Sequence, residues 1–262
     1  MSEHPSIAVT ELGSDGPPLV LLHGLAGSSR EMVPTARALS ENFRVLLVDQ
    51  RGHGSSTRRS ADLSRKAFVA DVVHVLERYA PGERSILVGQ SMGAHTAFLT
   101  AAERPDLVES LVMLEGHVGG SDDPRDAVRL GEFFASWPVP FVDEAHARAF
   151  LGSDAIVDAW IADLESTDDG LRPRFDPDIM QRTIEGVHKP RWDEWEALQV
   201  PTLAIFAKHG MFSAPDRQAL IHRRPSTERI DLSAGSHDAH LDAFEEWIEV
   251  LRGWIRAGDG VG

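Results

Sequence analysis

The sequence contains no cysteine among its 262 residues. Disulfide bonds, metal sites built on thiolates and a cysteine nucleophile are therefore excluded. The absence leaves the redox compartment undetermined, because a chain without cysteine is compatible with reducing and oxidising surroundings alike. Any nucleophile that this chain supplies is not a thiol.

Long apolar runs are also lacking. No stretch approaches the ~18 to 20 apolar residues that a membrane-spanning helix needs. The first residues, MSEHPSIAVTELGSDG, do not show the basic region followed by an apolar run that marks a secretory leader. We therefore expect a cytoplasmic protein that has no membrane partner.

Basic residues are few in comparison with acidic ones. The chain has 26 Lys and Arg against 41 Asp and Glu, which gives a formal net charge of -15. This charge repels phosphate backbones and anionic headgroups, so we expect neither nucleic acid nor an acidic membrane as a partner. With 42% hydrophobic and 26% charged residues, the composition is typical of a globular protein.

Short apolar runs alternate with amphipathic segments along the chain. This alternation predicts an α/β fold with a mostly parallel central sheet flanked by helices. The expected strands are Leu19–Leu22, Val45–Val48, Ile86–Val88, Leu111–Leu114, Leu203–Phe206 and a last one near Arg229–Leu232. Apolar residues recur at helical spacing at 68, 72, 75 and 76, at 94, 97, 98 and 101, and at 241, 244, 248, 251 and 255.

The alternation stops between residues 119 and 198. Aromatic residues and acidic helical segments are interleaved there, and prolines, which end helices, divide them. We interpret this part as a helical cap inserted into a core made of residues 1–118 and 199–262. Its aromatic residues either line an apolar pocket or pack together, and these are Trp137, Phe141, Phe150, Trp160, Trp192 and Trp195.

Residues Gly89–Gly93 read GQSMG, a GxSxG motif placed between an expected strand and an expected helix. A chain that turns this sharply needs glycine on both sides and holds Ser91 in a strained conformation with its hydroxyl outward. The same turn directs the Met92 amide toward the place where negative charge would develop on a carbonyl oxygen. The structural alternative is a tight turn with an idle serine.

In this context the chain resembles the α/β-hydrolase superfamily, from about Pro17 to Trp254. Residues 23–27, HGLAG, resemble the oxyanion loop of the family, which implies Leu25 as a second amide donor and an orienting role for His23. Residues 49–55, DQRGHGS, are similar to the DxRGxGxS turn of the family, which we expect to be structural.

A serine hydroxyl is a poor nucleophile near neutral pH, so a base must remove its proton, and histidine has a suitable pKa. Of the twelve histidines, His237 follows the last expected strand and precedes the terminal helix, where the superfamily places its catalytic histidine. His240 is the main alternative, and His117 and His209 follow it.

The acid of the triad departs from the usual family pattern. The common form has an aspartate four residues past the strand that ends at Phe206, and Gly210 stands there. Some family members carry the acid one strand earlier, where this chain has Glu115. Because the carboxyl ends of parallel strands face the ligand crevice, we expect Glu115 to orient the base. The competing acids are Asp216 and Asp238, and a chain without a working acid is a further alternative.

The resemblance and the motifs together predict a serine hydrolase. Ser91 attacks a carbonyl with His237 as base and Glu115 as acid, the amides of Leu25 and Met92 stabilise the oxyanion, and water cleaves the acyl-enzyme. We expect a small apolar or aromatic carboxylic ester or lactone as substrate. No cofactor or metal is implied, and a monomer or homodimer is expected.

Three other functions stay open at this point. Carbon–carbon bond hydrolysis uses the same fold, and a cofactor-free dioxygenase would use the His/acid pair without the serine as nucleophile. A non-catalytic binding protein is the third, because fold does not determine function. A serine at position 91, where haloalkane dehalogenases and epoxide hydrolases carry an aspartate, argues against those two activities.

Overall fold

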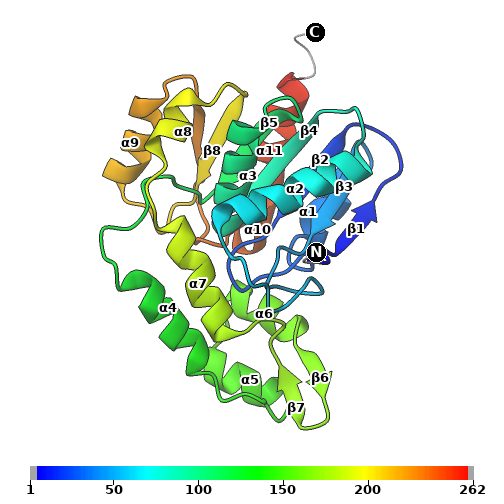
Figure 1. The fold of residues 1–262 in the computed structure, drawn as a ribbon, viewed down its shortest axis with the longest axis vertical. Coiled ribbons are helices and arrows are strands. Elements are labelled where there is room, and N and C mark those ends of the chain that lie inside the picture. The colour runs from blue at the N-terminus through cyan, green and yellow to red at the C-terminus, as the bar shows by residue number, and fades with distance from the viewer. Residues whose placement is uncertain (1–4, 259–262) are drawn as a thin grey trace.

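The computed structural model describes residues 5–258, and its centre is a seven-stranded sheet (Figure 1). The strand order is β1-β3-β2-β4-β5-β8-β9, with β1 antiparallel to β3 and all other neighbours parallel. This mostly parallel sheet flanked by helices confirms the predicted fold class. The strands are β1 (Val9–Leu12), β2 (Pro18–Leu22), β3 (Arg44–Val48), β4 (Ser85–Gln90), β5 (Val108–Leu114), β8 (Thr202–Phe206) and β9 (Glu228–Asp231).

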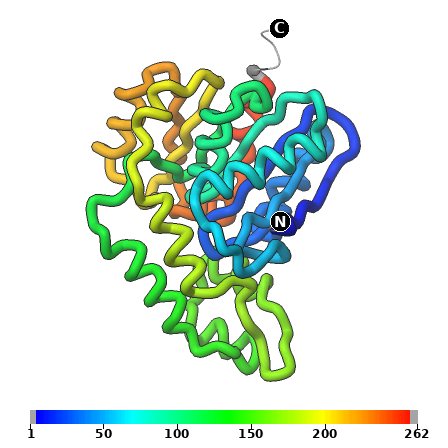
Figure 2. Tube along the Cα trace, viewed as in Figure 1, coloured from blue at the N-terminus to red at the C-terminus, as the bar shows by residue number. Residues whose placement is uncertain are grey.

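Helices cover both faces of the sheet (Figures 1 and 2). One face packs against α1 (Val33–Leu39) and α11 (Phe244–Gly258). The opposite face packs against α2 (Arg65–Tyr79), α3 (Met92–Glu103), α8 (Trp192–Ala197) and α9 (Ala214–Arg223). None of the helices in residues 5–258 is long and apolar enough to cross a membrane.

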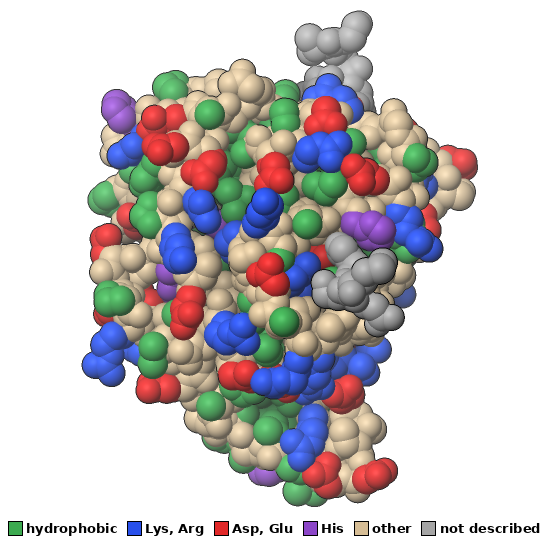
Figure 3. All heavy atoms as spheres, viewed as in Figure 1, with side chains coloured by type: hydrophobic (Ala, Val, Ile, Leu, Met, Phe, Trp, Pro, Cys, Tyr) green, Lys and Arg blue, Asp and Glu red, His purple; other side chains and the backbone are tan. Residues whose placement is uncertain are grey.

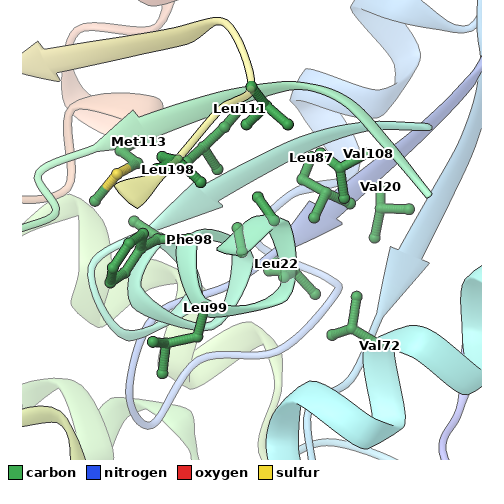
Figure 4. Packing of buried hydrophobic residues seen from close by; sticks show 14 of the residues in the cluster. Val20, Leu22, Val72, Leu87, Phe98, Leu99, Val108, Leu111, Met113 and Leu198 are labelled. Atoms are coloured by element: carbon green, nitrogen blue, oxygen red, sulfur yellow. The ribbon is translucent and has the colours of Figure 1, made fainter. Parts of the chain in front are cut away.

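Central strands are apolar at every position because both of their faces are covered. In β2, Val20 and Leu22 point to the α2 and α3 side, whereas Leu19 and Leu21 pack against α1 and α11. Figure 4 shows Val20, Leu22 and Phe98 of α3 among the labelled side chains of this cluster. Continuous apolar runs are thus the sequence signature of these central strands.

The two edge strands depart from that signature. β1 is half-buried at its two ends and exposed between them, so it leaves no apolar run and was not expected from the sequence. β9 is mostly exposed and lies at Glu228–Asp231, one residue earlier than the expected Arg229–Leu232. Edge strands lack a neighbour on one side, so packing constrains their composition less.

The terminal apolar stripe forms two helices rather than the single one expected. α10 (Ala239–Asp242) ends at Asp242, and α11 begins at Phe244. Ala243 has φ -128° and ψ 38°, which is not a helical conformation. The apolar spacing continues across the break, and for this reason the sequence pattern does not reveal it.

The segment between β5 and β8 projects from the carboxyl ends of the strands (Figure 1). It was expected to be wholly helical, and the structure adds a β-hairpin whose strands are too short to leave an alternating pattern. Asp168, Asp169 and Gly170 supply its turn, where Gly170 has φ 136°. The elements are α4 (Asp126–Ala135), α5 (Glu144–Leu151), α6 (Ala155–Ala162), β6 (Glu165–Thr167), β7 (Gly170–Arg172) and α7 (Pro177–Val187).

Helix α8, which the sequence places at the end of the cap, packs on the sheet. Trp195 is fully buried in the cluster that contains Phe98, and its indole N–H donates to the Leu220 carbonyl at 2.9 Å. The boundaries of the cap at 119 and 198 stay a prediction. The ends of the predicted core, residues 1–4 and 259–262, lie outside the described residues.

Candidate active site

Ser91 joins β4 to α3 in a conformation that side chains rarely adopt. Its φ is 51° and its ψ is -116°. A Cβ on Gly89 would lie 2.4 Å from the Ala94 amide nitrogen, and a Cβ on Gly93 would lie 2.2 Å from the Leu22 carbonyl oxygen. Both glycines are therefore sterically required, as the motif predicts, and the packed backbone holds the strained turn.

The loop after β2 lies against this turn. A Cβ on Gly24 would lie 2.2 Å from Gln90 Oε1, so the absence of a side chain permits the close approach. Leu25 follows in this loop, and Met92 is the first residue of α3, whose amide has no partner within the helix. Leu25, Met92 and Ser91 all line one cavity.

His23 is hydrogen-bonded to the loop after β2 and to the turn after β3. Its Nε2 accepts a hydrogen bond from the Gln50 amide at 3.0 Å, and its Nδ1 donates to the Gly24 carbonyl at 2.7 Å. Gln50 Nε2 in turn donates to the His23 carbonyl at 2.7 Å. Both ring nitrogens and the backbone carbonyl of His23 are therefore hydrogen-bonded, which supports the orienting role expected for this residue.

The turn at residues 49–55 is tied down by charged groups. The Asp49 carboxylate accepts from the Ser29 and Ser55 amides, each at 2.7 Å. Arg51 makes a buried bidentate pair with Asp71 at 2.6 and 2.7 Å. None of these residues lines the cavity at Ser91, and the structural role of the turn stays a prediction that these hydrogen bonds support.

His237 and Glu115 meet at the carboxyl end of the sheet. His237 Nδ1 lies 3.3 Å from Glu115 Oε2, and the Glu115 side chain is fully buried whereas that of His237 is 27% exposed. Glu115 Oε1 accepts from the Ala207 amide at 2.8 Å, and Oε2 accepts from the Met211 amide at 2.9 Å. These backbone donors satisfy a buried carboxylate and hold it in place beside the imidazole.

Glu115 explains why the usual acid position, residue 210, is a glycine. A Cβ there would lie 2.0 Å from Glu115 Oε1. Glu115 itself has φ 46°, a left-handed conformation that bends the chain directly after β5. The carboxylate from β5 thus reaches the space beside the loop after β8.

The competing acids are placed differently. Asp216 caps α9, where its Oδ2 accepts from the Ser213 amide at 3.0 Å. Asp238 accepts from Gln90 Nε2 at 3.4 Å, and burial raises its pKa above the ordinary value. Of these three carboxylates, Glu115 is the one within hydrogen-bond reach of the His237 ring in the described residues.

The other histidines have other surroundings. His240 is fully buried, with Nε2 3.7 Å from Glu31 Oε1. His209 is exposed on the loop after β8. His117 lines the cavity, but its Nε2 donates to the Asp216 carbonyl at 3.1 Å, and burial lowers its pKa.

The cavity has a volume of about 410 Å³ and lies between the carboxyl ends of the central strands and the segment that follows β5. Trp160 lines it, while Trp137 packs behind with its ring centroid 5.2 Å from that of Trp160. Both uses that the sequence left open for the aromatic residues therefore occur. The segment that follows β5 contributes these apolar residues to the wall: Leu130, Phe133 and Phe134 of α4, Ile156 and Trp160 of α6, and Ile184 and Val187 of α7.

Some cavity residues carry no signal in the sequence. Glu31 and His188 line the wall, although neither belongs to a recognisable motif. The polar residues Ser121 and Asp126 contribute as well and are hydrogen-bonded to each other. Only the folding of distant segments onto one cavity reveals these four residues.

Two further findings concern residues 5–258. No three His, Asp or Glu residues in this range gather in an arrangement that could hold a metal ion. A second cavity, of about 480 Å³, lies between α2, α3 and α8. None of the predicted site residues lines it.

Comparison with known proteins places the chain in a family. The family model described as the alpha/beta hydrolase fold matches residues 17–244. The chain is 28% identical to 2-(acetamidomethylene)succinate hydrolase of Mesorhizobium japonicum over 260 residues, which cover 96% of this chain and 92% of that one. It is 25% identical to the mouse sn-1-specific diacylglycerol lipase ABHD11, over 91% of this chain and 81% of the lipase.

A solved structure shows the same fold. The crystal structure of E-2-(acetamidomethylene)succinate hydrolase superposes with a TM-score of 0.87 at 24% identity, and 96% of each chain is covered. The relatives named here are hydrolases. The extent of the family match establishes that this chain belongs to the α/β-hydrolase fold family.

Proposed function

We propose that this chain is a serine hydrolase that cleaves a small apolar or aromatic carboxylic ester or lactone through an acyl-enzyme. One observation carries the proposal: Ser91, on its strained turn, and the His237–Glu115 pair line the same largely apolar cavity. Clefts of this kind bind ligands mainly through apolar contact, with a few polar groups that fix orientation.

The mechanism assigns each residue one task. Glu115 Oε2 accepts the Nδ1 proton of His237, which leaves Nε2 free to take the hydroxyl proton of Ser91. Ser91 Oγ then bonds to the carbonyl carbon, and the amides of Leu25 and Met92 stabilise the oxyanion. The imidazolium returns its proton to the leaving alkoxide, so the alcohol departs and an acyl-serine remains.

Deacylation repeats the sequence with water. His237 removes a proton from water, the hydroxide attacks the acyl-serine, and the proton passes to Ser91 Oγ as the acid is released. An ester or lactone is favoured because its alkoxide leaves more readily than an amine or a carbanion. We place the cap at residues 119–198, whose α4, α6 and α7 supply the apolar wall.

The test is covalent labelling with a fluorophosphonate, followed by intact mass spectrometry. We expect one stoichiometric adduct on the wild type, none on Ser91→Ala and slowed labelling of His237→Ala and Glu115→Gln. Ser121→Ala is the matched control, because Ser121 lines the same cavity and its loss should leave labelling intact. Hydrolysis of p-nitrophenyl esters should follow the same order.

Two outcomes would contradict the proposal. The absence of an adduct together with the absence of ester turnover would exclude an activated serine. Oxygen consumption that persists in Ser91→Ala would favour a cofactor-free dioxygenase that uses the His237–Glu115 pair.

A further inference from the structure

The charged residues that line the cavity at Ser91 are all acids or histidines. Four carboxylates face it, and no lysine or arginine is among the described residues of its wall. Glu115 is engaged by His237, and Asp126 is paired with Arg129, which lies outside the wall. The remaining two carboxylates are Glu31 and Asp238.

Glu31 and Asp238 lie beside the reacting groups of the proposed mechanism. Glu31 Oε1 accepts from the Gly24 amide at 3.4 Å, in the loop that also carries Leu25. Asp238 Oδ1 accepts from Nε2 of Gln90, the residue before Ser91, at 3.4 Å. Each of the two carboxylates is thus hydrogen-bonded to a residue next to one that the proposed mechanism uses.

The carboxylates of Glu31 and Asp238 interact electrostatically. Burial is the main cause of the raised pKa of Asp238, and the negative charge of Glu31 raises it further, while His237 and His240 lower it. Among the described residues, the basic side chain within 4.0 Å of the Glu31 carboxylate is that of the buried His240, whose Nε2 lies 3.7 Å from Oε1. This part of the cavity is therefore poorly solvated and has acidic character.

Two of the histidines in the wall, His117 and His188, are poor sources of counter-charge. Burial lowers the pKa of His117 and that of His188, which favours their neutral forms near pH 7. A carboxylate on the substrate would approach Glu31 and Asp238 in a wall whose described residues include no lysine or arginine. At about 6 Å and an effective dielectric constant of about 20, one such repulsion corresponds to about a 100-fold change in an equilibrium or rate constant.

We propose that the cavity accepts uncharged esters or lactones and rejects those with a carboxylate near the scissile bond, with Glu31 and Asp238 as specificity-determining residues. This inference rests on the proposed ester hydrolysis. It deepens that function by naming the charge of the substrate class, which the apolar wall alone does not define.

Three ethyl esters with the same leaving group test the inference. Ethyl butyrate and monoethyl succinate have the same acyl length and differ by a terminal carboxylate, and diethyl succinate is the larger, uncharged control. From ethanol release, we expect kcat/KM for both neutral esters to exceed that for monoethyl succinate by about 100-fold or more. Raising the ionic strength from about 0.05 to 0.5 M should narrow this ratio, because salt screens charge repulsion.

Isosteric variants assign the selectivity to residues. Glu31→Gln and Asp238→Asn keep an oxygen that can accept the bonds from Gly24 and Gln90, and the double variant should lower the ratio at least about tenfold. Asp122→Asn, at an exposed carboxylate outside the cavity wall, should leave the ratio unchanged. Ratios between substrates are used because they are independent of the fraction of folded enzyme.

The outcomes separate the two proposals. Labelled Ser91 with equal turnover of monoethyl and diethyl succinate would overturn the selectivity and leave the serine hydrolase in place. A large ratio that survives in the double variant would overturn the roles of Glu31 and Asp238. No labelling and no hydrolysis of any of the three esters would overturn the proposed function, and this inference with it.

Discussion

The carboxylate of Glu115 occupies the space that any side chain at position 210 would need. A Cβ on Gly210 would lie 2.0 Å from Glu115 Oε1, where real Cβ contacts essentially never fall below 3.0 Å. An acid at the end of β5 and a side chain on the loop after β8 therefore exclude each other. Substitutions at position 115 and at position 210 can therefore each test this relationship.

Gly210→Ala should displace the Glu115 carboxylate from His237. We expect a loss of about 1–3 kcal/mol of unfolding free energy from overpacking and a fall in kcat of about tenfold or more. Urea denaturation and ester hydrolysis measure the two effects. Gly253→Ala is the control, since a Cβ there meets nothing within 4 Å, and it should stabilise α11 by about 0.5–1 kcal/mol. Wild-type activity in Gly210→Ala would contradict the clash.

Moving the carboxylate from position 115 to position 210 should restore part of the activity that the loss of Glu115 removes. Glu115→Ala is expected to lower kcat by about 10³- to 10⁴-fold, because the imidazole loses its orienting partner. Glu115→Ala combined with Gly210→Asp should recover at least about tenfold of that loss, since the new carboxylate enters the vacated space. Glu109→Ala, at an exposed position of β5, serves as the control. An unaffected Glu115→Ala enzyme would remove Glu115 from the mechanism.

The strained backbone of Ser91 should be measurable as lost stability. Glycine adopts a positive φ without the steric cost that serine or alanine incurs. Ser91→Gly should therefore be more stable than Ser91→Ala by about 1 kcal/mol, although both variants lose the hydroxyl and should be inactive. Thermal melts of the two variants provide the comparison. Equal melting temperatures would show that the turn at φ 51° stores no strain.

The stability of the fold should decrease as the pH falls below about 6.5. Burial, followed by the neighbouring His23, lowers the pKa of His53 from 6.5 to about 3. Between these values the unfolded chain binds a proton that the folded chain excludes, so protonation favours unfolding. From pH 8 to pH 5 the His53 contribution should fall by about 2 kcal/mol.

Urea denaturation at both pH values checks this dependence. His53→Asn should reduce the difference in unfolding free energy between pH 8 and pH 5 by about 2 kcal/mol. His222→Asn, at an exposed histidine of α9, should retain the wild-type difference. If His53→Asn and the wild type showed the same dependence, His53 would not be the buried neutral group inferred here.

The sequence by itself determined the central sheet and the turn at Ser91. Strands covered on both faces must be apolar throughout, and a strand that turns sharply into a helix must carry glycines where backbone atoms would collide with any side chain. Both constraints act within a few residues, so they are visible in the order of amino acids. The edge strand β1, the hairpin β6–β7 and the break at Ala243 lie outside such constraints and were not predicted.

Only the tertiary structure decided which side chains meet. Glu115 and His237 are separated by 122 positions, and their proximity depends on the parallel pairing of β5 with β8 and of β8 with β9. The need for glycine at position 210 is explained only by the Glu115 carboxylate that fills the side-chain space there. The acidic character of the cavity likewise arises only on folding, which brings Glu31 and Asp238 from opposite ends of the chain into one wall. Charge repulsion and steric exclusion act through space, and their partners are set by packing rather than by sequence distance.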